Sequence, residues 1–200
     1  MDLWPEPGAL AQADSADVLR EWGNLGYPRR ALRLQECARA IVERHDGLVP
    51  ESEEHLLALP GIGTYTAAAV SAFAFGHRSV VLDTNILRVI GRVCDGVAAP
   101  PLHLTKAQTE RARSLVPDNP SESVVWNEGI MELGALICTA QSPACSSCPF
   151  ESACAWKAAG FPNQGQRVAR PQRFEGTDRQ VRGRIMKELR ATSPASLATL

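Results

Sequence analysis

The hydrophobic residues of this chain recur mostly at intervals of three and four, the spacing that places them on one face of an α-helix. The most regular stripe runs from Trp126 to Ile137. Shorter stripes with cap-like polar residues before them or glycine after them cover residues 18–22, 34–42 and 86–93. The pattern predicts an all-α protein built from short amphipathic helices.

Only Ser79-Val80-Val81-Leu82 resembles a β-strand, and this segment is short. No hairpin signal or internal repeat accompanies it. We therefore expect at most one short extended element among the helices.

Composition places the chain among globular proteins. Of its 200 residues, 44% are hydrophobic and 22% are charged, which excludes a disordered tail, a fibre and a coiled-coil rod. The net charge of −1 neither requires nor excludes a nucleic-acid partner. Residues 161–190 nevertheless carry a net charge of +5, so the remainder is acidic. A solvated segment is the usual explanation of such a tail, and phosphate binding is the alternative.

The N-terminal residues, the length of the apolar runs and the cysteines indicate a cellular compartment. Residues 1–7 lack the basic and apolar regions of a secretory signal, and no apolar run reaches the ~20 residues of a membrane span. Six cysteines without such a signal favour a reducing compartment and ligand or structural roles. We expect a soluble, cytoplasmic protein without membrane contact, and Cys37 and Cys94 fit unligated core cysteines.

The first motif that carries chemistry is the quartet Cys138, Cys145, Cys148 and Cys154, spaced C-x6-C-x2-C-x5-C. Four thiolates within so short a segment are able to surround one metal centre. Tetrahedral zinc is the alternative, although zinc sites typically use two tight cysteine pairs and only Cys145 and Cys148 form one here. The spacing therefore favours an iron–sulfur cluster only modestly.

The second motif is the turn Pro60-Gly61-Ile62-Gly63-Thr64, which lies between two predicted helices. Two glycines around an apolar residue permit a tight turn whose backbone N–H groups, with the next helix N-terminus, are able to hold a DNA phosphate. An ordinary inter-helix turn explains the segment equally well.

The third motif is Asp83-Thr84-Asn85 at the start of a predicted helix. By itself it is best explained as a helix N-cap, because all three side chains accept hydrogen bonds from free amides. An aspartate there is also able to face a cleft as a fixed negative charge and to stabilise a cationic sugar.

In order and spacing, the three motifs resemble the helix-hairpin-helix DNA glycosylase superfamily, which includes endonuclease III and adenine glycosylases of the MutY type. The resemblance covers nearly the whole chain, from Trp4 to about Arg173. It implies a [4Fe-4S] cluster on the four cysteines, a phosphate-binding turn at residues 60–64 and Asp83 as catalytic aspartate. It also implies a helical barrel domain over residues 1–120, a cluster domain over 121–160 and a basic tail over 161–200.

One position discriminates within this superfamily. Bifunctional lyases carry a lysine two residues after the second hairpin glycine, where this chain has Tyr65. Covalent amine catalysis is therefore absent there. Tyr65, Asn85 and the segment Gly23–Tyr27 resemble the adenine glycosylases, so we expect a monofunctional, monomeric, nucleoid-associated enzyme. Its substrate is expected to be double-stranded DNA with adenine opposite 8-oxoguanine or guanine, and Tyr65 and Asn85 are expected to order the sugar, the phosphate or Asp83.

The general acid of the resembled family is not found in this sequence. The family uses a glutamate in a glutamine-rich helix upstream of every matched segment, and Glu36, Glu43, Glu128 and Glu132 do not replace it. We therefore expect a chain that lacks the first helices of the fold and excises adenine extremely slowly or not at all, since losing a general acid costs about 10²–10⁴-fold in rate.

Three alternatives remain at this point. The first is a thymine-mismatch glycosylase of the same fold. The second is a non-catalytic iron–sulfur DNA-binding fragment, and the third is a zinc-stapled helical adaptor.

Overall fold

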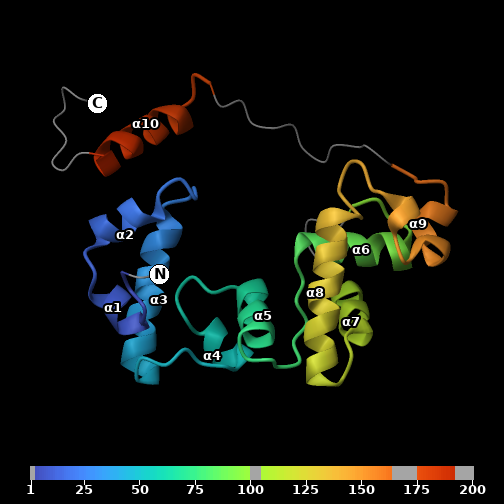
Figure 1. The fold of residues 1–200 in the computed structure, drawn as a ribbon, viewed down its shortest axis with the longest axis horizontal. Helices are drawn as coiled ribbons and strands as arrows, with labels where there is room; N and C mark the ends of the chain where they lie inside the picture. The colour runs from blue at the N-terminus through green and yellow to red at the C-terminus, as the bar shows by residue number, and fades with distance from the viewer. Residues whose placement is uncertain (1–2, 100–104, 164–174, 192–200) are drawn as a thin grey trace. The chain divides into compact units, whose positions relative to one another are not determined.

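The computed structural model describes residues 3–99, 105–163 and 175–191, and each regular element in these ranges is a helix (Figure 1). The all-α prediction is confirmed. None of the helices in these ranges has the length and apolar character of a membrane span. The elements are α1 (Pro7–Gln12), α2 (Ser15–Trp22), α3 (Arg29–His45), α4 (Glu53–Leu57), α5 (Thr64–Phe73), α6 (Thr84–Asp95), α7 (Lys106–Leu115), α8 (Pro120–Leu136), the short 3-10 turns η1 (Cys145–Ser147) and η2 (Glu151–Ala153), α9 (Ala155–Ala158) and α10 (Asp178–Ala191).

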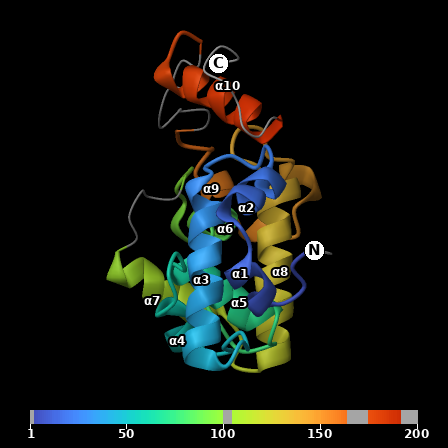
Figure 2. The same ribbon diagram turned by 90° about the vertical axis from the view of Figure 1, so that its left-hand side faces the viewer.

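The chain forms two compact units. The first contains residues 1–50, 59–61 and 167–200, and the second contains residues 51–58 and 62–166. In the first unit, α1 and α2 pack beside the long helix α3 (Figure 2). The buried side chain of Gln35 donates to the carbonyls of Leu10 and Ala13 at 3.3 and 2.6 Å, and accepts from Ser15 Oγ at 2.7 Å. One polar residue of α3 thus fixes the connection between α1 and α2.

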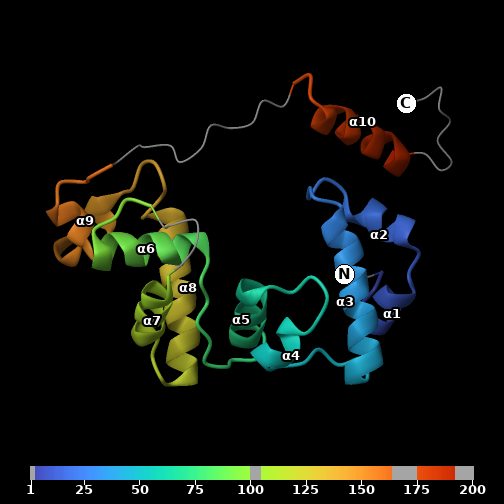
Figure 3. The ribbon, with the colours of Figure 1, turned by 180° about the vertical axis from the view of Figure 1, so that it is seen from behind.

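In the second unit, α6 crosses α8 and contacts α9 (Figure 3). Its core joins residues from α5, the following connection, α6 and α7, with apolar residues of α8 packed against it: Ala68, Ala72, Val81, Ile86, Ile90, Ala112, Trp126, Ile130 and Met131. The two helices approach closely at Gly134, where an added Cβ would lie 2.7 Å from Asn85 Cβ and 2.8 Å from Asn85 O. Only glycine permits this approach.

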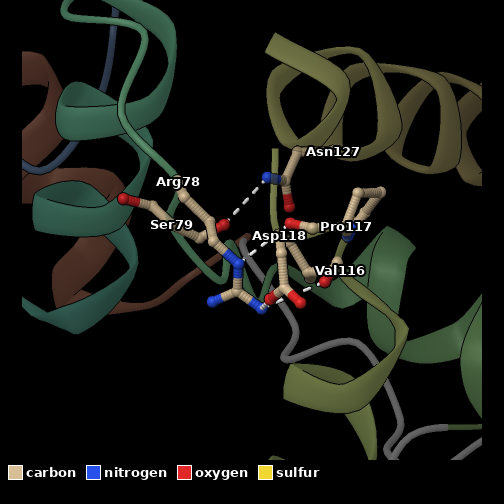
Figure 4. Close-up of polar contacts among 6 residues, drawn as sticks. All are labelled: Arg78, Ser79, Val116, Pro117, Asp118 and Asn127. Carbon is tan, nitrogen blue, oxygen red and sulfur yellow. Dashed lines mark hydrogen bonds and ion pairs between the residues drawn. The ribbon is translucent and has the colours of Figure 1, made fainter. Parts of the chain in front are cut away.

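The segment Ser79–Leu82, which resembles a strand in sequence, forms none and runs without regular structure. Its polar backbone groups are bonded instead by the fully buried side chain of Asn127 on α8 (Figure 4). Asn127 Nδ2 donates to Ser79 O at 2.9 Å, and Asn127 Oδ1 accepts from Val81 N at 3.3 Å. Beside it, Arg78 donates to the carbonyls of Val116 and Pro117. A side chain thus replaces the strand partner.

Candidate active site and metal centre

The predicted phosphate-binding turn connects α4 to α5 and begins after the buried side chain of Leu59. Gly61 has φ +79°, and an added Cβ would lie 3.0 Å from Arg33 Cβ, so glycine is required there. Gly63 is the N-cap of α5 and offers no side-chain acceptor. Because the first amides of a helix have no intrahelical partner, the start of α5 leaves backbone donors open to an anion.

Asp83 is the N-cap of α6, so its interpretation as a helix cap is confirmed. Its Oδ1 accepts from Ile86 N at 2.6 Å, and its Oδ2 accepts from Asn85 Nδ2 at 2.8 Å. The residue is only partly buried. Both carboxylate oxygens are therefore held in a fixed orientation, which a role in catalysis also requires.

A buried arginine extends this network, and it is not among the site residues predicted from the sequence. Arg88 is 6% exposed, and its Nη2 donates to Asn85 Oδ1 at 2.8 Å and to Gly134 O at 2.6 Å. Its Nε donates to Cys138 O at 2.7 Å. Burial lowers the pKa of this guanidinium, as does Arg92, whereas Cys138 and Asp83 raise it. Nothing in the sequence pattern signals this burial, because at about 100° per residue Arg88 lies on the side of α6 away from the apolar stripe of Ile86, Ile90 and Val93.

The four predicted cysteine ligands line a single pocket in the second unit. Apolar residues of α6, α8 and α9, among them Val89, Leu133 and Trp156, complete its wall. Arg92 lies beside the thiols: its Nη1 lies 3.4 Å from Cys138 Sγ, and its guanidinium lies 4.2 Å from the ring centroid of Trp156. Cys154 Sγ donates to Arg92 O at 3.6 Å.

The donor set of this pocket fits a cluster held by thiolates. Burial, followed by the other thiols, raises the pKa of Cys145, while Lys157 lowers it. The thiols are thus close enough to repel one another as anions, and Arg92 and Lys157 supply compensating charge. Among the described residues, no group of three histidine, cysteine or acidic side chains is placed to hold a single metal ion.

The remaining predicted residues have mixed outcomes. Tyr65 lies on α5 and is 44% exposed, and no hydrogen bond between described residues joins it to Asp83. The structure joins Asp83 to Asn85 by a hydrogen bond, and the role of Tyr65 stays a prediction. Cys37 is buried, as expected of a core cysteine. The same prediction for Cys94 is wrong, because this residue lies on the outer side of α6 and is exposed.

The loop between α2 and α3 presents apolar side chains for which the sequence predicted no role. Leu25 and Tyr27 are each 71% exposed, and Tyr27 has φ +47°, which is unusual for a residue other than glycine. Trp22 Nε1 donates to Gly26 O at 2.9 Å and fixes the loop. In the sequence, the signal that could have found them is the pair of large apolar residues on either side of Gly26.

The chain is similar in sequence to known DNA repair proteins. Residues 1–116 match the family described as HhH-GPD superfamily base excision DNA repair protein. The adenine DNA glycosylase of Mycolicibacterium smegmatis is 47% identical over 201 residues, covering 100% of this chain and 67% of the relative. That of Mycobacterium tuberculosis is 45% identical over 98% of this chain and 64% of its own length. The chain thus spans about two thirds of these relatives.

Thymine-specific relatives are more distant in sequence. The thymine-DNA glycosylase of Aeropyrum pernix is 36% identical over 76% of this chain and 69% of its own length. Among solved structures, a thermostable thymine-DNA glycosylase superposes with a TM-score of 0.70 at 30% identity, covering 79% of this chain and 72% of that one. Endonuclease III in a non-covalent DNA complex superposes at 0.68 and 23% identity, covering 80% and 73%, which shows the fold alone.

Proposed function

Because the chain belongs to the HhH-GPD superfamily of base excision DNA repair proteins, we propose that it is a monofunctional glycosylase that hydrolyses the bond between adenine and deoxyribose in a mispair with 8-oxoguanine or guanine. The observation that carries the proposal is the carboxylate of Asp83, held by Ile86 N and Asn85 at the start of α6. The higher identity to adenine-specific relatives, 47% against 36%, favours adenine over thymine.

The proposed chemistry follows from a fixed negative charge. Such an enzyme extrudes the target nucleotide from the duplex, and the sugar becomes cationic as the glycosidic bond breaks. The ionised carboxylate of Asp83 stabilises that cation, and Asn85 holds the carboxylate in place. Tyr65 stands where a lysine would form a Schiff base, so water is the nucleophile. In the net reaction the water oxygen bonds to the anomeric carbon as the glycosidic bond breaks, a water proton ends on the departing adenine, and the backbone stays uncleaved.

Two further features would contact the duplex. The open amides at the start of α5, after Gly63, suit a backbone phosphate, and this contact positions the protein without reading sequence. The exposed side chains of Leu25 and Tyr27 offer apolar surface for insertion beside the unstacked bases.

We propose that Cys138, Cys145, Cys148 and Cys154 hold a [4Fe-4S] cluster. Four thiols in one pocket, with Arg92 and Lys157 beside them, fit an anionic cluster. When bound, the cluster would supply a structural cross-link between α8 and the α9 region. The hydrolysis itself would not use its redox chemistry.

Metal analysis tests the cluster separately from the catalytic proposal. We expect anaerobically purified protein to be brown and to contain four irons and four sulfides per chain, as a [4Fe-4S] cluster requires. Cys148→Ser should lower the iron content, whereas Cys94→Ser, which changes an exposed cysteine outside the quartet, should not. Colourless protein that contains zinc would contradict the cluster.

Base release under single-turnover conditions tests the function. Three duplexes are compared: adenine opposite 8-oxoguanine, adenine opposite guanine, and thymine opposite guanine. With protein in large excess and long incubation, we expect free adenine from the first two and none in the Asp83→Asn variant. Release of thymine, or adenine release that Asp83→Asn does not reduce, would overturn the proposal.

A further inference from the structure

Helix α10, which the proposed function does not use, has two chemically distinct faces. Val181, Ile185 and Leu189 recur every four residues and form an apolar stripe. Arg179, Gly183 and Lys187 recur at the same interval, displaced from it by two residues. Because each residue advances about 100° around a helix, this second row lies opposite the apolar stripe. No acidic residue interrupts it.

Two cations of α10 lie on or beside the basic row. Arg184 and Lys187 are exposed, and neither forms an ion pair with a carboxylate of the described residues. Elsewhere in the chain, by contrast, Arg111 pairs with Asp95 and Lys157 pairs with Glu151. Cations without a carboxylate partner are able to neutralise the phosphates of a polyanion. The counterions that are released then favour binding.

Gly183 lies in the middle of the basic row with open space around it. An added Cβ would have no heavy atom within 4 Å, so packing in the described chain does not require glycine there. Glycine within a helix costs about 1 kcal/mol relative to alanine. A residue without a side chain, between Arg179 and Lys187, permits close approach of a ligand to the helix backbone.

The segment that contains α10 is net positive, whereas the rest of the chain is net negative. Residues 161–190 carry +5 while the full chain carries −1, so the rest of the molecule would repel a polyanion. We propose that α10 lays the face of Arg179, Gly183 and Lys187, with Arg184 at its edge, along the phosphate backbone of duplex DNA. This inference rests on the proposed function, in which duplex DNA is the substrate. The contact is independent of base sequence and of mispairs.

An anionic membrane surface also attracts basic amphipathic helices. DNA is favoured here because the chain belongs to a DNA repair family and because a glycine interrupts the basic row. The apolar stripe, with Val181 55% and Leu189 44% exposed, is the face a lipid surface would use instead.

The test measures how salt weakens binding to an undamaged duplex. The variant R184Q/K187Q removes two charges and retains residues that favour helix. Its matched control, R111Q/R113Q, removes two charges of α7 that are already paired with Asp95 and Glu110. We expect the slope of log affinity against log salt concentration to fall in magnitude by about two in R184Q/K187Q, and to stay unchanged in the control.

The outcomes separate this inference from the proposed function. Undamaged DNA needs no base excision, so the slope reports on α10 even in protein that releases no adenine. Equal slopes for R184Q/K187Q and the unsubstituted chain would overturn the inference. It would also be overturned if phosphatidylserine vesicles, and not DNA, lost binding in R184Q/K187Q. An equal loss of affinity for mispaired and undamaged duplexes would support it.

Discussion

The N-termini of α5 and α6 have nearly the same backbone but opposite chemistry. The N-cap of α5, Gly63, has φ −102° and ψ 174°, and that of α6, Asp83, has φ −94° and ψ 172°. Only the side chain differs between them. Gly63 leaves the leading amides of α5 open, whereas the carboxylate of Asp83 accepts a hydrogen bond from the amide of Ile86 in the first turn of α6. One helix end is thus available to an external anion, and the other holds an anion of the protein itself.

This difference shows how one backbone arrangement serves two purposes. The partial positive charge at a helix N-terminus favours any nearby anion. At α5 that anion would be a phosphate of the ligand. At α6 it is Asp83, whose second oxygen is bonded by Asn85, so its orientation is set before any ligand arrives.

Asp83→Asn removes the charge from α6 while keeping a side chain that caps helices well. We expect the single-turnover rate of adenine release to fall about 10²–10³-fold, the usual cost of losing one electrostatic stabiliser. The free energy of unfolding should change by less than about 1 kcal/mol, as measured by urea denaturation. A rate that survives this substitution would mean that the carboxylate acts only as a cap.

Gly134→Ala disturbs the support behind the start of α6. The added Cβ would lie 2.8 Å from Asn85 O and 3.0 Å from Asn85 C, and a backbone is unable to yield as a side chain does. We expect a loss of about 1–3 kcal/mol in the free energy of unfolding from overpacking.

The control for Gly134→Ala lies on the same helix. At Gly129 an added Cβ meets nothing within 4 Å. Gly129→Ala should therefore stabilise the protein by about 0.5–1 kcal/mol, because alanine restricts the unfolded chain and favours helix. Equal effects of the two substitutions would contradict the close approach at Asn85.

Gly63→Asp gives α5 the cap that α6 already has. The backbone of Gly63 suits any residue and an added Cβ meets nothing within 4 Å, so the fold should tolerate the change. We expect stability to change by only a few tenths of a kcal/mol, and duplex affinity to fall by up to about tenfold as the new carboxylate repels a phosphate. Fluorescence anisotropy measures the affinity, with Gly63→Ala as the uncharged comparison. Unchanged affinity would separate this turn from DNA binding.

The sequence predicts the parts of the fold that depend on neighbouring residues. The helices that begin after Asp14 and Asp83 form as expected, because each aspartate accepts from an amide two or three positions ahead. The cysteine quartet was likewise found from spacing alone, since its members lie close in sequence and line one pocket.

Features that depend on distant residues were not predictable from the sequence. The segment at Val81 resembled a strand, but its partner is the side chain of Asn127, from another helix. Arg88 is buried because the carbonyls of Gly134 and Cys138 satisfy it, and no local pattern reveals those acceptors. The exposure of Cys94 depends on which side of α6 the rest of the unit covers.

Because Cys94 is exposed, it is a site for selective chemical labelling. It is the exposed thiol of the six, while Cys37 is buried and the other four face the pocket. A maleimide dye would attach to the last turn of α6 while all four candidate ligands stay in place. The part of its surface that is covered and the neighbouring Asp95 raise the pKa of this otherwise exposed thiol, so labelling proceeds best in mildly alkaline buffer. Such a dye would report on helix α6 while the protein meets its duplex.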